Sequence, residues 1–377
     1  MKYSIISFTH NGMQLSRKLK KGLDKEEITL FTKCSTITKI ECQPDIAFVH
    51  CSISEWAKQQ MEEKKVLLFI GACAIAVRAV APHIIDKLHD SPVLVMDEKG
   101  KYIIPILSGH MGGANELACW ISEKTGAIPV ITTATDINKK FSVDLFAKKN
   151  NLAIVNKEGI AKVSSKVLAI DETSNLEVTI SIETGHIKDN AHMPAGLRLV
   201  SYPPNQPVDI IIASQVQEYY EHSCYSVKND SDDKIFRASL VLQPKEYVIG
   251  MGCRKGKEAD KIEQFIRRSM NELGILDRQI LALASIEQKR EERGLIEWSM
   301  KAGVPFVTYT AEELKEVKGN FHESVFVEEK VGVGNVCERA ALKKSGAGAM
   351  LVYEKHAEDG MTIAIAKRNW SVIFDET

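Results

Sequence analysis

One nine-residue segment concentrates the residue types that catalysis most often uses. It runs from Leu107 to Asn115 and reads Leu-Ser-Gly-His-Met-Gly-Gly-Ala-Asn. His110 titrates near neutral pH, so it is well suited to move a proton. Glycines let the main chain approach a bound group, and a helix that begins here offers unpaired N–H groups to an anion or an oxyanion. We interpret this segment as a candidate reaction site.

A carboxylate and three hydroxyls lie at the end of the next predicted strand. Residues 132–136 read Thr-Thr-Ala-Thr-Asp and follow an apolar run over 128–132. Parallel strands end at one edge of a sheet, so we expect this segment to emerge beside the His110 turn. Two roles are then open to Asp136: it orients His110 or a water molecule, or it caps the following helix.

A third segment, 250–256, reads Gly-Met-Gly-Cys-Arg-Lys-Gly after a predicted strand. It is one residue longer than the fingerprint of dinucleotide-binding turns, so it indicates a nucleotide site only weakly. Arg254 and Lys255 suit substrate carboxylates better, because arginine binds carboxylates bidentately; a solvated charge pair is the alternative. Lys289 and Glu292 stand three residues apart on one predicted helix, a spacing typical of a surface ion pair.

Strands that alternate with helices must position these segments. Buried strands are predicted at 66–70 and 102–107, and an amphipathic helix at 257–273. Glycine-bearing turns at the strand ends predict a ligand cleft between domains. We expect an α/β fold class with three domains. The N-terminal (1–137) and C-terminal (236–377) α/β domains have mostly parallel sheets, and a small middle α/β domain (138–235) joins them. The middle domain includes a linker or exposed loop at 226–234.

Charge and composition argue against several classes of function. Lys plus Arg total 49 and Asp plus Glu total 50, so the net charge of −1 gives no support for binding to nucleic acid or a membrane surface. The eight cysteines form no Cys-x-x-Cys pair and the histidines show no metal-ligand spacing. We therefore expect reduced structural thiols and no protein-bound metal. The chain has neither a signal peptide nor a membrane helix by sequence, so we expect a cytoplasmic protein.

These segments and several others resemble the CbiG family, the cobalt-precorrin-5A hydrolases of the anaerobic cobalamin pathway. The resemblance runs through all three expected domains in order. Cys73 departs from it, because glycine is expected there in many relatives, and this affects only the local turn. The matching segments are Phe69 to Ala72, Val77 to Pro82, Leu107 to Asn115, Pro129 to Asp136, Gly250 to Gly256, Ala284 to Ile286 with Lys289 and Glu292, Val331 to Val333 with Glu338 to Ala341, and Lys355 with Thr362 to Ala366.

The resemblance implies a reaction on a cobalt-bearing contracted tetrapyrrole with a δ-lactone between a ring A acetate and the former meso carbon. Water opens the lactone, the two-carbon fragment leaves as acetaldehyde, and cobalt-precorrin-5B is the product, which is expected to pass to methyltransferases of the pathway. The reaction needs no nicotinamide, flavin or ATP, and its cobalt is carried by the substrate. Lactone hydrolysis needs a base, oxyanion donors and an acid. Our hypothesis makes His110 the base, the N–H groups from Gly112 to Asn115 the oxyanion donors, and Asp136 or Thr135 the residue that orients His110.

The carboxylates of such a substrate imply cationic side chains around it. Two alternatives stay open at the reaction site: His110 as an axial ligand to the substrate's cobalt, and a covalent route through Ser108, around which the Gly-x-Ser-x-Gly pattern is absent. Two other functions also stay open, a non-catalytic carrier of corrinoid intermediates and a nucleotide-dependent α/β enzyme. The expected substrate-binding residues are Arg78, Ser108, Gly109, Gly112, Gly113, Asn115, Arg254, Lys255, Lys289, Glu338, Arg339 and Lys355.

Overall fold

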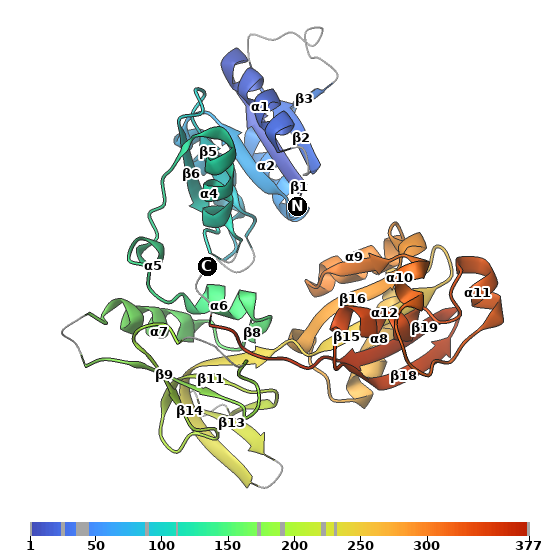
Figure 1. Cartoon of the computed structure of the whole chain (residues 1–377). Coiled ribbons are helices and arrows are strands. Elements are labelled where there is room, and N and C mark those ends of the chain that lie inside the picture. Colours follow the sequence, from blue (N-terminus) through green and yellow to red (C-terminus); the bar gives the residue numbers. More distant parts are fainter. Residues whose placement is uncertain are drawn as a thin grey trace. The chain divides into compact units, whose positions relative to one another are not determined.

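The structure is a computed structural model (Figure 1) that describes residues 2–23, 27–34, 45–86, 90–110, 112–171, 175–188, 193–219, 224–229 and 232–374. The chain divides into two compact units, Met1–Leu145 and Phe146–Thr377. The first unit contains one sheet and the second contains two, each with helices packed against it. This confirms the predicted α/β class. None of the helices in the described ranges is both long and apolar enough to cross a membrane.

The sheet of the first unit has seven strands in the order β3-β2-β1-β4-β5-β6-β7. Its neighbours pair in parallel except β5 and β6, which are antiparallel. The strands are β1 (Lys2–Ser7), β2 (Glu27–Thr32), β3 (Ile46–Phe48), β4 (Val66–Ile70), β5 (Val93–Met96), β6 (Tyr102–Leu107) and β7 (Ile128–Pro129).

Helices cover both faces of this sheet because its central strands are apolar on both sides. Alternate residues of a strand point to opposite faces. In β4, Leu68 and Ile70 join the core beneath α1 (His10–Gly22) and α4 (Ala114–Thr125), whereas Leu67 and Phe69 join the core beneath α2 (Ile53–Glu62) and α3 (Cys73–Val80). A continuous apolar run is the sequence signature of such a doubly buried strand.

The reversal between β5 and β6 corrects one expectation. Gly71 follows β4 and the His110 turn follows β6, and we expected both turns at one ligand-binding edge. Because β4 is parallel to β5 and β6 is antiparallel to it, the two turns emerge at opposite edges of the sheet. In contrast, β7 is parallel to β6, so the segment after β7 emerges at the same edge as His110, as predicted.

The first sheet of the second unit has the order β10-β9-β11-β14-β13-β12, and β8 pairs with β14 outside this path. Parallel pairs join β10, β9, β11 and β14, and the remaining pairs are antiparallel. The elements are β8 (Leu152–Ile154), α7 (Glu158–Leu168), β9 (Val178–Ile182), β10 (Leu197–Val200), β11 (Val208–Ile212), β12 (Val216–Tyr219), β13 (Cys224–Asn229) and β14 (Asp232–Pro244).

The prediction of a linker or exposed loop at 226–234 is wrong. Strands β13 and β14 form an antiparallel ladder from Cys224 opposite Arg237 to Asn229 opposite Asp232. Ladder hydrogen bonds join backbone groups, so a run rich in Asn and Asp can form strands despite its low strand propensity. Strand β14 then continues to Pro244, past the expected boundary at residue 235.

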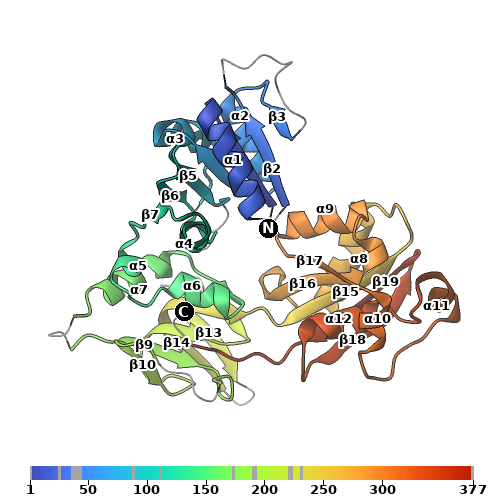
Figure 2. The same cartoon turned by 45° about the horizontal axis from the view of Figure 1, so that its top comes forward.

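The second sheet of this unit has the order β17-β16-β15-β19-β18. Figure 2 shows α8 (Ala259–Glu272) and α9 (Arg293–Ala302) on one side of it and α12 (Cys337–Ser345) and α10 (Ala311–Lys315) on the other. Its strands are β15 (Tyr247–Cys253), β16 (Ile280–Ile286), β17 (Phe306–Tyr309), β18 (Met350–Glu358) and β19 (Met361–Lys367), and the short helix α11 (Val325–Val331) precedes α12.

The end of the chain returns from this sheet to the preceding one. Val372 forms a parallel bridge with Ile187, and the indole N–H of Trp370 donates to Ser214 Oγ at 3.2 Å. The N–H of Ile373 donates to Asn150 Oδ1 at 2.8 Å. Residues 370–373 thus pack with the region between residues 146 and 244, although in sequence they follow the C-terminal sheet.

Candidate functional site

The His110 turn owes its glycines to tight local packing. Ser108 adopts a positive φ of 55° and Gly113 one of 81°, which reverses the chain between β6 and α4. A Cβ atom at Gly112 would lie 2.4 Å from the Cβ of Ser108, and one at Gly109 would lie 2.8 Å from Asn115 Oδ1. The Ser108 hydroxyl donates to the Asp90 carbonyl at 2.8 Å and is buried, so it is not placed as a nucleophile.

Three of the backbone donors expected for an oxyanion, those of Gly113, Ala114 and Asn115, bond within the turn, and the oxyanion site over Gly112 to Asn115 stays a prediction. The N–H of Gly113 donates to the His110 carbonyl at 2.9 Å, and those of Ala114 and Asn115 donate to the carbonyls of Ser108 and Gly109 at 3.1 Å. A donor that bonds within its own loop is less available to an oxyanion. The side chain of Asn115 instead donates to Asp136 Oδ2 at 2.6 Å and to Thr133 Oγ1 at 3.0 Å.

His110 lies between two carboxylates. Its Nε2 is 2.9 Å from Asp136 Oδ2, and its Nδ1 is 3.4 Å from Asp144 Oδ1. Hydroxyls complete the surroundings: Thr135 Oγ1 lies 3.3 Å from Nε2 and Ser142 Oγ lies 3.3 Å from Nδ1. Ser142 also donates to Asp144 Oδ1 at 2.5 Å. We call His110, Asp136, Asp144, Thr135 and Ser142 the histidine cluster.

The cluster stabilises the protonated imidazole. The hydrogen bond to Asp144 raises the pKa of His110 above its ordinary value, burial of the ring opposes this rise, and Asp136 adds to it. Of the three ionisable side chains Asp136 is the most accessible, with 29% of its side chain exposed against 12% for His110 and 10% for Asp144. A histidine with a raised pKa keeps its proton to higher pH, which favours the role of an acid over that of a base.

The sequence anticipated only part of this cluster. It predicted the proximity of His110, Asp136 and Thr135, and the structure places these three side chains together. It missed Asp144 and Ser142, which come from the start of α6 (Val143–Lys149) and the residue before it. The Ser-Val-Asp stretch at 142–144 is a typical helix start, and this capping pattern concealed a second partner for the imidazole.

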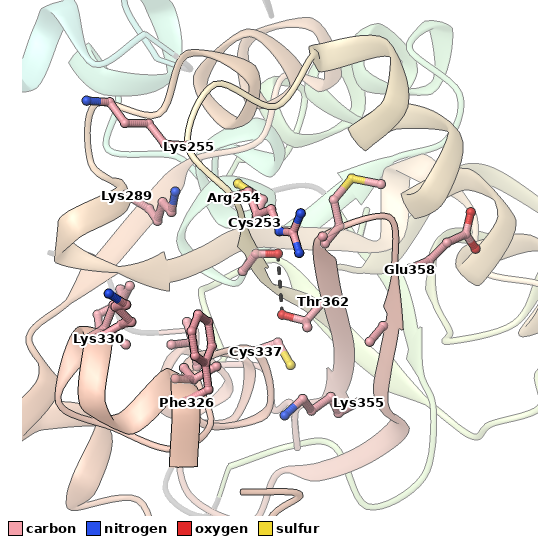
Figure 3. Close-up of a pocket in the computed structure, with 18 of the residues that line it drawn as sticks. Cys253, Arg254, Lys255, Lys289, Phe326, Lys330, Cys337, Lys355, Glu358 and Thr362 are labelled. Atoms are coloured by element: carbon pink, nitrogen blue, oxygen red, sulfur yellow. Dashed lines mark hydrogen bonds between the residues drawn. The ribbon is translucent and has the colours of Figure 1, made fainter. Parts of the chain in front are cut away.

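A cavity of about 720 Å³ opens at the ends of β15 and β16, beside α11 and the β18–β19 hairpin (Figure 3). Four cations that the sequence predicted for substrate binding line it, together with Lys330, which the sequence did not single out. The predicted cations are Arg254, Lys255, Lys289 and Lys355. The rest of the wall is largely apolar. We call this space the C-terminal cavity. Its volume lies within the range typical of small-molecule sites.

The acidic residues of the cavity wall are paired with cations outside it. Glu358 Oε2 lies 2.7 Å from Arg268 Nη2, and Asp359 Oδ2 lies 2.5 Å from Lys257 Nζ. Neither Arg268 nor Lys257 lines the cavity. The positive charge of the wall is therefore not neutralised by the carboxylates of the wall. The cavity suits a ligand that carries several negative charges.

The Lys289–Glu292 pair is buried, so the surface pair predicted from its spacing is wrong. Lys289 Nζ lies 2.8 Å from Glu292 Oε2, and only 6% of the Glu292 side chain is exposed. The other oxygen of Glu292 accepts the N–H of Gly256 at 2.7 Å. Burial opposes ionisation, but the hydrogen bonds from Lys289 and Gly256 lower the pKa of Glu292 below its ordinary value. Glu292 thus fixes both Lys289 and the turn that carries Arg254 and Lys255.

Glu338 and Arg339 do not line the cavity, and their role in substrate binding stays a prediction. Glu338 is fully buried and accepts the N–H groups of His322 at 3.1 Å and Lys355 at 2.8 Å. Burial opposes its ionisation, yet these hydrogen bonds lower its pKa. Arg339 donates to the carbonyls of Leu314 and Val317 and to Glu323. Both residues hold neighbouring loops in place, and Glu338 reaches the site only through Lys355.

The glycines at 250 and 252 have a packing role that explains the resemblance to a nucleotide-binding turn. A Cβ at Gly250 would lie 1.8 Å from the Cys337 carbonyl oxygen, and one at Gly252 would lie 2.8 Å from Thr362 Oγ1. Gly250 thus permits α12 to pack directly on β15. The turn needs no bound pyrophosphate to account for its glycines.

No described contact joins Arg78 to the histidine cluster or to the C-terminal cavity. It is exposed on α3, which follows β4 at the sheet edge opposite the His110 turn. Its role in substrate binding stays a prediction.

Comparisons with known proteins match two family models to this chain. The cobalamin synthesis G N-terminal model matches residues 55–136, and the cobalamin synthesis G C-terminus model matches residues 247–366. A Priestia megaterium protein named cobalt-precorrin-5A hydrolase is 30% identical over 371 residues, covering 97% of this chain and 94% of that protein. A Salmonella typhimurium protein of the same name is 30% identical over 364 residues, or 96% of each chain. The solved structure of CobE, a protein from the cobalamin (vitamin B12) biosynthetic pathway, is 28% identical over 33% of this chain and 92% of its own, with a TM-score of 0.32.

Proposed function

Since this chain belongs to the CbiG family, we propose that it opens the δ-lactone of cobalt-precorrin-5A with water, releases acetaldehyde and leaves cobalt-precorrin-5B. Two relatives that match over nearly the whole chain are named cobalt-precorrin-5A hydrolase, which supports a hydrolase of cobalamin biosynthesis. The structural observation that carries the chemical part of the proposal is the imidazole of His110 held between Asp136 and Asp144.

The reaction requires that protons move in both directions. Water adds to the lactone carbonyl, the ring oxygen leaves with a proton, and the resulting alcohol then loses a proton as its C–C bond to the macrocycle breaks. The electrons of that bond enter the conjugated ring, a macrocycle carbon takes up a proton, and acetaldehyde leaves. In our proposal the protonated His110 supplies the proton to the leaving oxygen. This replaces the role of base that we expected from the sequence, because the cluster stabilises the imidazolium.

Asp136 is the group we assign to take up a proton. It is the most exposed ionisable member of the cluster, and its Oδ2 already accepts from both His110 and Asn115. A proton that arrives at Asp136 can return to His110 across 2.9 Å. Asp144 is a positioning residue in this scheme, because it acts on the substrate only through the imidazole.

The C-terminal cavity is the site we assign to the ring and its carboxylates. A cobalt-bearing tetrapyrrole has apolar faces and carboxylates at its rim, and the cavity combines an apolar wall with cations from several elements. Arginine and lysine bind such groups through charge-assisted hydrogen bonds. We further propose that the product passes from here to a methyltransferase of the pathway.

The test is incubation of the purified chain with cobalt-precorrin-5A while acetaldehyde is trapped and counted. We expect one acetaldehyde for each macrocycle converted, with no added nucleotide. A carrier would bind the macrocycle and release no acetaldehyde. A nucleotide-dependent enzyme would show a higher melting temperature in NAD(P) or ATP, because a ligand stabilises the state that binds it.

A further inference from the structure

The short helix α11 presents an aromatic ring and a lysine to the C-terminal cavity, and neither is engaged by the fold. Phe326 and Lys330 both line the cavity and stand four residues apart, so they share one face of the helix. Phe326 is 68% exposed. In the described part of the chain, no hydrogen bond or ion pair holds the Lys330 ammonium. Large apolar side chains that remain this exposed in a cavity are candidates for ligand contact.

Two further residues of α11, which also line the cavity, fix the helix to the core. Val327 and Val331 pack against the apolar cluster that contains Ile286 and Val336. The N-terminus is capped by Ser324, whose hydroxyl accepts the N–H of Val327, and the C-terminus ends at Gly332 in the left-handed conformation. The helix is therefore anchored without help from Phe326 or Lys330, and both side chains are held ready at the wall of the cavity.

We propose that α11 is the element that selects a flat, carboxylate-bearing ring, with Phe326 stacking on the face of the ring and Lys330 binding one carboxylate at its rim. This inference rests on the substrate class of the proposed function, but not on the reaction. The charge of the cavity supports this proposal. Lys330 adds its positive charge to those of Arg254, Lys255 and Lys355, while the acidic wall residues pair with cations outside the cavity. A ligand without an apolar face would leave Phe326 unused.

The test measures corrinoid binding by the full chain with two probes that share a ring. Cobyrinic acid carries free peripheral carboxylates, whereas cobinamide carries amides in their place. We expect Phe326→Ala to weaken binding of both probes about tenfold, since an aromatic contact and its buried area are lost. We expect Lys330→Ala to weaken cobyrinic acid alone, about threefold, with the difference shrinking in high salt.

Matched controls come from exposed residues that do not line the cavity. Val325 is 73% exposed on the same helix, and Lys318 is an exposed lysine nearby in the chain. Val325→Ala and Lys318→Ala should bind both probes as the wild type does. Because Phe326 and Lys330 are exposed, their variants should also melt at the wild-type temperature, which separates lost contact from lost folding.

The outcomes separate this inference from the proposed function. If the wild type converts cobalt-precorrin-5A but Phe326→Ala and Lys330→Ala bind both probes unchanged, the role of α11 is wrong and the function stands. If both variants lose affinity while the wild type releases no acetaldehyde, the role of α11 stands and the hydrolysis is wrong. Equal losses in the control variants, or no binding of either probe by the wild type, would overturn the inference.

Discussion

The histidine cluster and the C-terminal cavity use charge in opposite ways. In the cluster, each nitrogen of one imidazole faces a carboxylate, so the charges are matched within a few ångströms. In the cavity, cations come from several elements, and the acidic wall residues are neutralised by Lys257 and Arg268 outside it. Matched charges control the protonation of a single group, whereas unmatched charges attract an anionic ligand. We therefore propose proton transfer for the first region and substrate binding for the second.

Substitution of Asp144 gives the largest expected change after that of His110 itself. Asp144→Asn removes the main cause of the raised His110 pKa, so that pKa falls. An acid works only while protonated, and activity is lost as pH rises through its pKa. The alkaline limb of the kcat profile should therefore move to lower pH, and kcat at neutral pH should fall by about 10- to 100-fold.

Asp136→Asn sharpens this test, because Asp136 contributes less to the raised pKa. It should lower kcat and shift the alkaline limb by less than Asp144→Asn does. An alkaline limb that stays in place in Asp144→Asn would show that His110 is not the titrating acid.

Two ion pairs near the cavity differ in burial, and their loss should differ accordingly. Glu292 is 6% exposed and paired with Lys289, whereas Glu287 is 45% exposed and paired with Arg290. Glu292→Gln removes a buried carboxylate from the partly exposed Lys289 and should lower the free energy of unfolding by about 2 kcal/mol. Glu287→Gln should change it by less than about 0.5 kcal/mol. Equal values in chemical denaturation would show that burial does not distinguish the pairs.

Substitution of Arg254 tests the binding role of the cavity. Arg254→Ala should raise KM for cobalt-precorrin-5A about tenfold and leave kcat near the wild-type value, because it removes a contact to the ground state and the transition state alike. The increase should shrink in high salt. Arg293→Ala, on the exposed start of α9 and outside the cavity wall, is the matched control. A fall in kcat with an unchanged KM would place Arg254 in the chemistry instead.

The smallest expected effect is on stability. The pKa of His110 is raised in the folded chain, so the stabilisation from its charge is complete below the unfolded pKa of about 6.5 and is lost as pH rises through the folded pKa. The melting temperatures of the wild type and His110→Gln should therefore differ more at pH 6 than at pH 9. The difference should change by about 2–4 °C, which corresponds to about 1 kcal/mol. A gap that widens as pH rises would contradict the raised pKa.

Local patterns in the sequence predicted the elements well where burial is continuous or strictly periodic. The run at 66–70 is β4, and the amphipathic pattern at 257–273 is α8 (Ala259–Glu272). The direction of β6 was not predictable in the same way, because direction depends on which neighbour a strand pairs with and not on its own residues. The same limit applies to the hairpin of β13 and β14, whose polar residues indicated a loop.

The candidate site was predictable to the extent that its residues directly follow predicted strands. His110 and Asp136 follow neighbouring parallel strands, so the sequence predicted that their side chains lie close together. Asp144 lies eight residues after Asp136, at the start of α6, where capping alone explains an aspartate. Glu338 was expected to bind substrate as part of a segment that matches the family, and the structure shows it fully buried and accepting the N–H of Lys355. Burial of a charged residue is not visible in composition or spacing.

The most direct test of this account compares the wild type with His110→Gln in two assays on cobalt-precorrin-5A, binding of the macrocycle and release of acetaldehyde. The account predicts that the variant binds the macrocycle with wild-type affinity and releases acetaldehyde at least about 100-fold more slowly. Acetaldehyde release near the wild-type rate would contradict it, because the imidazole between Asp136 and Asp144 would then have no part in the reaction.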